Sequence, residues 1–224
     1  IKNLDNIVTP SKENQIKKNE NNRDWGYKTG QIINVTSGWE KAVEGKDKFN
    51  WHLMNKGDIF FQDATNLNKI DDNKYDFVIS SNVLEHIANP LKALNEFKRV
   101  IKKNGFIAII VPYYKYTFDF KRPVTTIEHI REDFINSVGE DDLTHLKEVV
   151  ELTDEGDPDH NAQVNPNFIK KEFEEYCKDN FNNRVMHHHV YDVDLLKSVA
   201  NEANLKVLDL NYFANSCVML TQKY

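Results

Sequence analysis

The stretch from Tyr75 to Pro112 constrains the fold more than any other part of this sequence. A short apolar run, Phe77–Ile79, stops at the polar Ser80-Ser81-Asn82, which is typical of a buried parallel strand. Asn89-Pro90 then opens an amphipathic segment, which we expect to form a helix that ends at Asn104-Gly105. Its apolar residues recur at three- and four-residue spacing: Leu91, Leu94, Phe97, Val100 and Ile101.

A second strand, fully buried, is expected over Phe106–Val111. Two parallel strands joined by a crossover helix form a doubly wound α/β unit, and such units bind ligands at the carboxyl ends of their strands. Ser80-Ser81-Asn82 and Pro112-Tyr113 fall at those ends. We therefore expect a ligand site where these two segments meet.

The remaining strands are expected on both sides of this unit. Short apolar runs predict strands over Leu4–Val8, Gly30–Val35 and Asp58–Phe61, and a terminal hairpin over Val207–Tyr212 and Cys217–Leu220. Ser11–Asp24 is rich in Lys, Asn and Glu, and such a polar run indicates a flexible segment or lid. The pattern predicts one domain over residues 1–224.

Residues 113–186 form a long excursion after the second strand of this unit, and we interpret them as an inserted helical cap. Three helices are expected there: one starting with capping-box spacing at Thr125 and running to about Ser137, one over Glu140–Leu152 and one over Pro166–Phe181. Another amphipathic helix, Asp192–Asn204, follows the cap and leads into the terminal hairpin.

Composition excludes several classes of protein. A length of 224 residues with 11% aromatic residues allows one sizeable core. The net charge of -6 argues against a nucleic-acid partner, whose usual footprint is a basic face. Cys177 and Cys217 form no zinc or redox motif, and no segment reaches the ~18 apolar residues of a membrane span. We expect a cytoplasmic protein with a small-molecule substrate.

The segment Asp76–Ile87, followed by Asn89-Pro90 and a helix ending in Lys-Lys-Asn-Gly, resembles the region after strand 4 of class I S-adenosylmethionine (SAM)-dependent methyltransferases. The similarity is greatest to type 11-like enzymes of a bacterial subgroup often associated with surface-polysaccharide pathways. That subgroup shows elements like Tyr116–Thr126, Asp141–Leu146 and Asn182–Val190 in this order. The resemblance implies a Rossmann-like fold with a mostly parallel seven-stranded sheet and a terminal antiparallel hairpin.

The resemblance also implies where SAM binds. Asp63 would accept from the adenine amino group, and Ala64 would donate its backbone N–H to the ring. Ser80, Ser81 and Asn82 would line the methionine side of the cleft. From the residues alone, the alternative for Asp63 is a turn-capping side chain, and the alternative for Ser80-Ser81 is an ordinary strand end.

Upstream, the sequence departs from the family pattern. The segment placed after the first strand, Ile7–Ser11, contains no Gly, although Gly normally lets the backbone approach the cofactor. Thr9 and Ser11 would take that position, and Asn34 stands where an acidic residue usually holds the ribose hydroxyls. An Asn can hydrogen-bond a hydroxyl without supplying charge. The glycine motif is degenerate.

Four residues are candidates for proton transfer: His86, Asp119, His187 and His189. An imidazole titrates near neutral pH and can act as a general base, and Asp119 could accept a hydroxyl proton. His86 is alternatively a packing residue that anchors the loop after the strand.

Substrate contacts are expected from the segment after the second strand and from three consecutive histidines, His187–His189, which we call the histidine run. This set comprises Tyr113, Tyr114, Lys115, Arg122, His129 and His188. Arg122 and Lys115 could clamp a carboxylate or phosphate. Since the chain must return to the sheet edge, the histidine run is expected to face Asp119 and Arg122.

No metal ligands are assigned. An alternative is that His187 and His189, two apart on an extended segment, chelate one ion that Asp119 or His129 completes.

The sequence therefore predicts a SAM-dependent methyltransferase that acts at oxygen of a small polar or sugar-linked acceptor, with a phosphate-bearing precursor among the candidates. The rival reading is a methyltransferase-fold protein that has lost SAM binding and serves in binding or assembly, which the missing glycines motivate. A nicotinamide-dependent dehydrogenase is disfavoured because no G-x-G-x-x-G occurs.

Overall fold

The computed structural model describes residues 48–51, 55–58, 62–153, 170–213 and 215–224. A small antiparallel sheet pairs β1 (Lys48–Trp51) with β2 (Asn55–Asp58). The expected strands over Leu4–Val8 and Gly30–Val35 lie outside the described residues, as do the polar segment Ser11–Asp24 and most of Asp58–Phe61.

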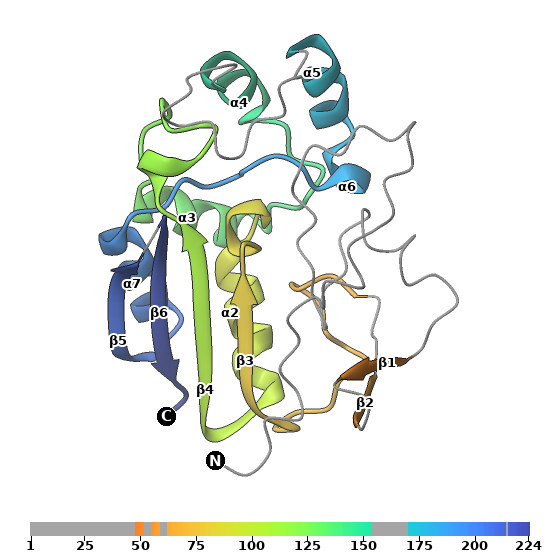
Figure 1. The fold of residues 1–224 in the computed structure, drawn as a ribbon, viewed down its shortest axis with the longest axis vertical. Coiled ribbons are helices and arrows are strands. Elements are labelled where there is room, and N and C mark those ends of the chain that lie inside the picture. Colours follow the sequence, from red (N-terminus) through yellow and green to blue (C-terminus); the bar gives the residue numbers. More distant parts are fainter. Residues whose placement is uncertain (1–47, 52–54, 59–61, 154–169, 214) are drawn as a thin grey trace.

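The main sheet has four strands in the order β3-β4-β6-β5 (Figure 1). β3 (Tyr75–Ser81) runs parallel to β4 (Ile101–Pro112), and both point towards the helical cap. The terminal hairpin of β5 (Lys206–Phe213) and β6 (Ser216–Gln222) adds antiparallel pairs to β4. The described sheet is thus mixed and four-stranded, and it includes the expected hairpin; the seven-stranded parallel arrangement is not seen in the described residues.

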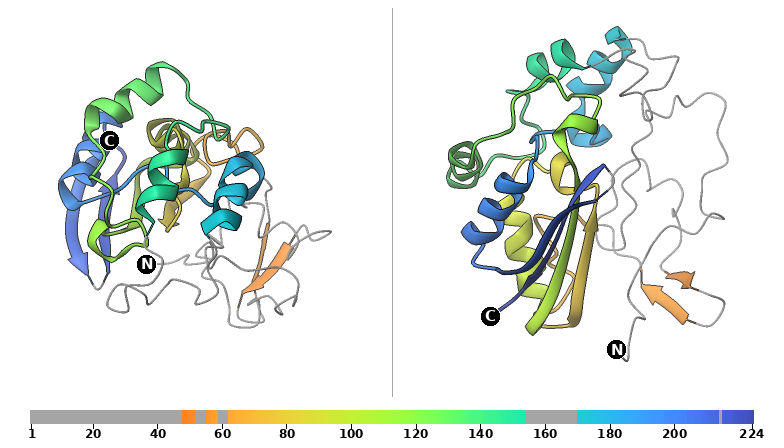
Figure 2. Two further views of the ribbon diagram at one scale, coloured as in Figure 1. Left: turned by 90° about the horizontal axis from the view of Figure 1, so that it is seen from above. Right: turned by 60° about the vertical axis from the view of Figure 1, so that its left-hand side comes forward.

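Helices α2 (Pro90–Val100) and α7 (Val193–Glu202) cover one face of this sheet (Figure 2). Their apolar stripes bury side chains such as Leu94 and Val199 against Ile109 and Met219, which confirms the predicted periodicity. Each helix begins at a side-chain cap: Asn89 accepts a hydrogen bond from the Lys92 amide, and Asp192 accepts one from the Leu195 amide.

The predicted end of α2 was wrong. The helix stops at Val100, and Ile101 already pairs with Tyr75 as the first residue of β4. The register shifts before Phe106, so Asn104-Gly105 forms an irregularity within the strand instead of a helix terminus. Asn104 takes the positive φ of 61°, and a Cβ on Gly105 would lie 2.8 Å from the backbone oxygen of Asp76. Close backbone approach therefore requires glycine here.

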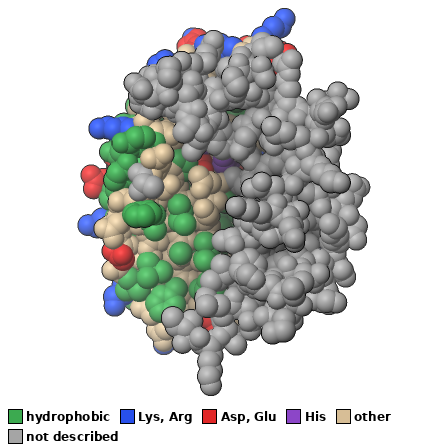
Figure 3. All heavy atoms as spheres, in the orientation of Figure 1, with side chains coloured by type: hydrophobic (Ala, Val, Ile, Leu, Met, Phe, Trp, Pro, Cys, Tyr) green, Lys and Arg blue, Asp and Glu red, His purple; other side chains and the backbone are tan. Residues whose placement is uncertain are grey.

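The two core strands are buried on one face only, in contrast to the expectation of full burial. Val78, Ile107 and Ile109 point towards the helices and are buried. Ile79 is 44% exposed and Phe106 is 40% exposed on the opposite face. Figure 3 shows hydrophobic side chains spread across this side of the described sheet.

The cap follows β4 and lies above the carboxyl ends of β3 and β4 (Figure 1). Its helical elements are η3 (Tyr114–Tyr116), α3 (Ile127–Ile135), α4 (Leu146–Leu152), α5 (Lys170–Lys178) and α6 (Asn180–Asn183). A short 3-10 helix, η2 (Leu84–His86), follows β3 at the end of the sheet that faces the cap.

The cap helices are shorter than predicted. Thr126, one residue later than expected, caps α3, while the Thr125 hydroxyl accepts from the Val190 amide. α4 begins only at Leu146, and the last helix breaks at Asp179 into α5 and α6. Residues 154–169 lie outside the described part. Among the described helices, none has the length and apolar composition to cross a membrane.

Candidate functional site

The histidine run crosses directly over the ends of β3 and β4 (Figure 1). The His189 amide donates to the Glu85 carbonyl at 3.3 Å, and the Tyr114 amide donates to the Tyr191 carbonyl at 3.0 Å. The run thus hydrogen-bonds both to the turn after β3 and to the segment after β4. The expected return of the chain to the sheet edge is confirmed.

Asp119, Arg122 and His187 form a buried group that we call the Arg122 cluster. Arg122 Nη1 donates to Asp119 Oδ2 at 2.8 Å and to the His187 carbonyl at 2.7 Å. Asp119 Oδ1 lies 3.2 Å from His187 Nδ1. Burial alone would raise the pKa of Asp119, but His187 and Arg122 together hold it well below its usual value. Asp119 is therefore a buried carboxylate that fixes the His187 ring.

The geometry does not support the expected role of Arg122 as a substrate clamp. Its Nε donates to Glu148 Oε1 at 2.8 Å, in addition to the bonds to Asp119 and the run. The side chain is 1% exposed. Arg122 fastens the segment after β4 to α4 and to the histidine run, because its donors point at protein acceptors.

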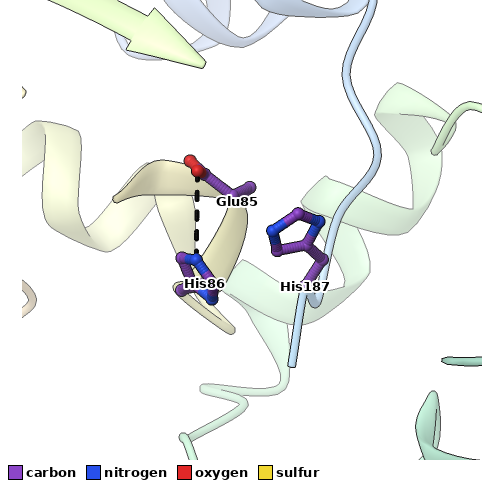
Figure 4. A group of neighbouring side chains, drawn as sticks. All are labelled: Glu85, His86 and His187. Atoms are coloured by element: carbon purple, nitrogen blue, oxygen red, sulfur yellow. Dashed lines mark ion pairs between the residues drawn. The ribbon is translucent and has the colours of Figure 1, made fainter. Parts of the chain in front are cut away.

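Glu85 and His86 from η2 lie beside His187 (Figure 4). His86 Nδ1 lies 3.0 Å from the Met186 carbonyl, and its ring meets His187 edge-on with centroids 4.6 Å apart. Burial raises the pKa of Glu85 to about 7. Burial, followed by the proximity of His187, lowers the pKa of His86 to about 3. Since a base of such low pKa is weak at neutral pH, the anchoring alternative suits His86 better than the catalytic one.

Adjacent histidines of the run reach different partners. His188 Nε2 lies 3.0 Å from Asn180 Nδ2 and 3.6 Å from Glu140 Oε2. His189 Nε2 lies 3.2 Å from the Ala88 carbonyl. His187 and His189 belong to separate groups of potential ligands, so the alternative in which they chelate one ion is wrong. His188 is 1% exposed and engaged by protein groups, and its expected role as a substrate contact stays a prediction.

His129, Asp133, His145 and His189 gather in a second group, the His129 cluster. His129 Nε2 is 2.9 Å from His145 Nε2 and 3.4 Å from Asp133 Oδ2. His189 Nε2 is 3.6 Å from the same Asp133 oxygen. Burial raises the pKa of Asp133 to about 6, and burial lowers the pKa of both His145 and His189. The expected substrate contact His129 therefore lies in this group.

The cofactor residues after β3 offer hydrogen-bonding groups at the expected place. Ser80 is 4% exposed, and its Oγ has no hydrogen-bond partner within the described residues. Ser81 Oγ donates to Asn82 Oδ1 at 3.1 Å, and Asn82 turns the chain with a positive φ of 53°. A buried hydroxyl without a partner at a strand carboxyl end fits a polar ligand such as SAM.

Asp63 is engaged by protein groups on both carboxylate oxygens. Oδ1 accepts from the amide and the hydroxyl of Thr65, and Oδ2 lies 2.9 Å from Arg184 Nη2. Arg184 also reaches Glu140 Oε2 at 3.1 Å, which ties the loop before β3 to the cap. This arrangement supports the turn-capping alternative for Asp63. Ala64 beside it is fully buried, and Thr9, Ser11 and Asn34 lie outside the described residues.

Tyrosines form an aromatic platform, defined as Tyr113, Tyr114, Tyr116 and Tyr212. Ring centroids are 4.8 Å apart for Tyr113 and Tyr114, and 4.8 Å apart for Tyr113 and Tyr212. Lys115 Nζ lies 5.6 Å from the Tyr114 ring centroid, and its side chain is exposed. The expected substrate residues Tyr113, Tyr114 and Lys115 thus share one partly open surface at the end of β4.

Sequence reasoning missed several members of these groups. Glu85, Asp133 and Glu140 are buried acids that were not singled out, and neither were His145 and Arg184. One signal was available: His129 and Asp133 are four residues apart on a predicted helix, so they share a face. His145 and Arg184 lie within the elements Asp141–Leu146 and Asn182–Val190 that carry the resemblance, and Glu85 adjoins His86, but nothing in the sequence assigned them to a site.

Comparison with known proteins adds a family match. Residues 39–109 match a family model described as a methyltransferase domain. A 40-residue stretch is 50% identical to an uncharacterized protein of Methanocaldococcus jannaschii, covering 18% of this chain and 17% of that protein. The chain therefore spans about a sixth of that relative's length.

Two solved structures illustrate the similarity. A SAM-dependent methyltransferase from Aquifex aeolicus aligns at 14% identity over 75% of this chain and 55% of its own, with a TM-score of 0.39. A SAM-dependent methyltransferase from Methanosarcina mazei aligns at 12% identity over 82% of this chain and 74% of its own, with a TM-score of 0.42. The family match indicates that residues 39–109 are similar to methyltransferase domains.

Proposed function

We propose that this protein transfers a methyl group from SAM to a hydroxyl oxygen of a small polar or sugar-linked acceptor. The observation that carries the proposal is the pair of Asp119 and His187, whose side chains are 3.2 Å apart. Asp119 lies in the segment that follows β4, and His187 lies in the run whose backbone hydrogen-bonds to the turn after β3. A carboxylate that orients an imidazole is the usual arrangement of a general base, and a hydroxyl acceptor needs one.

SAM supplies a methyl group that its sulfonium charge already activates, so the protein has to align the donor and the acceptor. Ser80, Ser81 and Asn82 would hold the methionine side at the end of β3. Asp119 would accept a hydrogen bond from His187 Nδ1, and His187 Nε2 would take the proton of the acceptor hydroxyl. Asp119 remains ionised because its pKa is held low, and it stabilises the imidazolium that forms.

The aromatic platform suits the acceptor. Sugar rings present flat C–H faces that pack on aromatic rings, and Tyr113 and Tyr114 lie half-buried beside the strand end. Exposed Lys115 is placed to meet a phosphate or carboxylate on the same molecule, a role that the buried Arg122 does not fill. An acceptor of the kind found in surface-polysaccharide pathways would satisfy both features.

A specific observation favours the rival, a binding or assembly protein without SAM. Asp63, the expected adenine acceptor, is already bonded to Thr65 and Arg184. Calorimetric titration with SAM and with its demethylated product separates the two readings. Binding of either compound supports the enzyme, and the absence of binding by both supports the rival.

Turnover measurements then test the catalytic pair. We expect His187→Gln and Asp119→Asn to lower turnover by ~10²–10⁴-fold while SAM affinity changes less than about twofold. Glu132→Gln, which alters an exposed acid on α3, serves as the matched control and should retain full turnover. Wild-type turnover in both pair variants would exclude this base.

A further inference from the structure

The His129 cluster brings three potential metal ligands together from two segments of the chain, with a further histidine beside one of them. His129 and Asp133 lie one turn apart on α3, His145 is the residue before α4, and His189 comes from the histidine run. His129, Asp133 and His189 each offer a ligand atom, and these atoms all lie within 4.8 Å of one another. His145 joins through its Nε2, 2.9 Å from His129 Nε2.

The two distances to Asp133 fit a shared cation better than hydrogen bonds. Asp133 Oδ2 lies 3.4 Å from His129 Nε2 and 3.6 Å from His189 Nε2, beyond the ~2.7–3.2 Å of an N–H···O bond. Zn²⁺ binds imidazole nitrogen and carboxylate oxygen at ~2.0–2.2 Å, so two ligands of a tetrahedral ion lie ~3.3 Å apart. Both observed separations are close to that value.

Asp133 provides an independent sign of a missing partner. Its residue is 7% exposed, and within the described residues Oδ2 has no hydrogen-bond partner. A buried carboxylate oxygen without a partner is costly, because desolvation is not offset. A cation placed among Asp133, His129 and His189 would offset it.

We propose that the His129 cluster binds one divalent transition-metal ion through His129, Asp133 and His189, with Zn²⁺ a good match to two imidazoles and one carboxylate. Three protein ligands leave the fourth position of a tetrahedral ion to a water molecule. The ion would join α3 to the histidine run, and so hold the cap over the strand ends. This role is separate from methyl transfer and does not depend on it.

Loading the site requires one local exchange. His189 Nε2 lies 3.2 Å from the Ala88 carbonyl, and a nitrogen that ligates a metal cannot also donate a proton there. Metal binding therefore moves the His189 proton to Nδ1 and releases the Ala88 carbonyl. It also breaks the hydrogen bond between the Nε2 atoms of His129 and His145, because a ligating His129 Nε2 carries no proton; a proton on that nitrogen moves to Nδ1 or is released to solvent.

The test uses the full-length protein after treatment with a chelator. Calorimetric titration with ZnCl₂ should give one site, and Asp133→Asn should weaken it at least ~10-fold. Glu132→Gln is the matched control: it removes the same charge from the neighbouring residue, which is exposed, and should bind like the wild type. Equal affinity in Asp133→Asn and Glu132→Gln, or the absence of wild-type binding, would overturn the proposal.

Cobalt provides a readout that does not depend on how the variant folds. Co²⁺ added to the wild type should give the visible absorption of tetrahedral nitrogen and oxygen coordination, without the charge-transfer band of a thiolate ligand. A thiolate band would place the ion at Cys177 or Cys217 and refute the site, as would an octahedral spectrum.

Discussion

Two buried layers of this protein are equally shielded from water but are built from opposite residue types. The first lies between the sheet and helices α2 and α7, and side chains such as Leu94, Val199 and Met219 fill it. The second lies between the strand ends and the cap, and Asp119, Arg122 and the histidine run fill it. The first layer is stabilised by the apolar surface area that it buries. The second is stabilised by hydrogen bonds and ion pairs between particular side chains.

The difference matters when a side chain is removed. Apolar burial is non-directional, so losing one group of the first layer costs its transfer free energy and leaves a cavity. In the polar layer each charge is stabilised by particular neighbours, and removing one leaves another charge buried without compensation. The predictions below test this comparison, in order of decreasing expected effect.

Arg122→Met should cause the largest loss, ~3–5 kcal/mol of unfolding free energy, because it leaves the ionised Asp119 buried without its cation. Chemical denaturation measures it. The control is Lys115→Met, which removes a positive charge from an exposed residue of the same segment and should stay within ~0.5 kcal/mol. Similar, small losses in both variants would mean that the Arg122 cluster contributes no more than surface charge.

Leu94→Ala should cost ~2–5 kcal/mol, since the side chain is fully buried between α2 and the sheet. Because no titrating group changes, the loss should be the same at pH 5 and at pH 8 when urea denaturation is repeated. A loss that varies by more than about 1 kcal/mol between these conditions would show that the two layers are energetically coupled.

Glu140→Gln tests how the contribution of the polar layer to the free energy of unfolding depends on pH. Burial raises the pKa of Glu140 to about 7 from an ordinary 4.5, so its neutral form is favoured in the folded state. This contribution to stability is complete below pH 4.5 and is lost as pH rises to 7. Relative to the variant, the wild type should therefore lose ~1–3 kcal/mol across that range.

The neighbouring His188 titrates in the opposite sense, since burial lowers its pKa to about 3. Its contribution is present above its ordinary pKa of 6.5 and is lost as pH falls towards 3. His188 is present in both proteins, so the difference between them isolates Glu140. A pH-independent difference would mean that Glu140 is ionised throughout, held by Arg184.

Asp192→Ala should have the smallest effect, ~0.5–2 kcal/mol, because it removes the side-chain cap of α7 and leaves the apolar stripe intact. Thermal unfolding measures the change. Asp192→Asn keeps an acceptor for the Leu195 amide and should recover most of the stability. Equal loss in both variants would assign the effect to charge instead of the cap.

The apolar layer was predictable from local pattern. The three- and four-residue spacing after Pro90 identified α2 and its buried face, and the run before Asn204 identified α7. The terminal hairpin was placed within a few residues. The errors fell where tertiary contact overrides local signals: Ile101 pairs with Tyr75 in the sheet, which ends α2 before Asn104-Gly105.

The position of the candidate site was predictable from the sequence, but the hydrogen-bond partners of its side chains were not. Topology required residues after β4 and the histidine run to return to the same sheet edge, and both do. Residue type alone assigned Arg122 to substrate, whereas in the structure Glu148, Asp119 and the His187 carbonyl already use its donors. No local pattern specifies those acceptors, because Glu148 is 26 residues away and His187 is 65 away.

By itself, the sequence determined the α/β unit of β3, α2 and β4, the order of the segments that follow it and the end of the sheet at which they meet. Hydrophobic periodicity and turn residues carry that information, since both act over a few neighbouring residues. Only the tertiary structure decided which way each histidine points. Residues two apart on a regular extended segment share a face, yet His187 meets Asp119 and His189 meets Asp133. The two carboxylates come from separate parts of the cap, and no local pattern specifies which histidine each one meets.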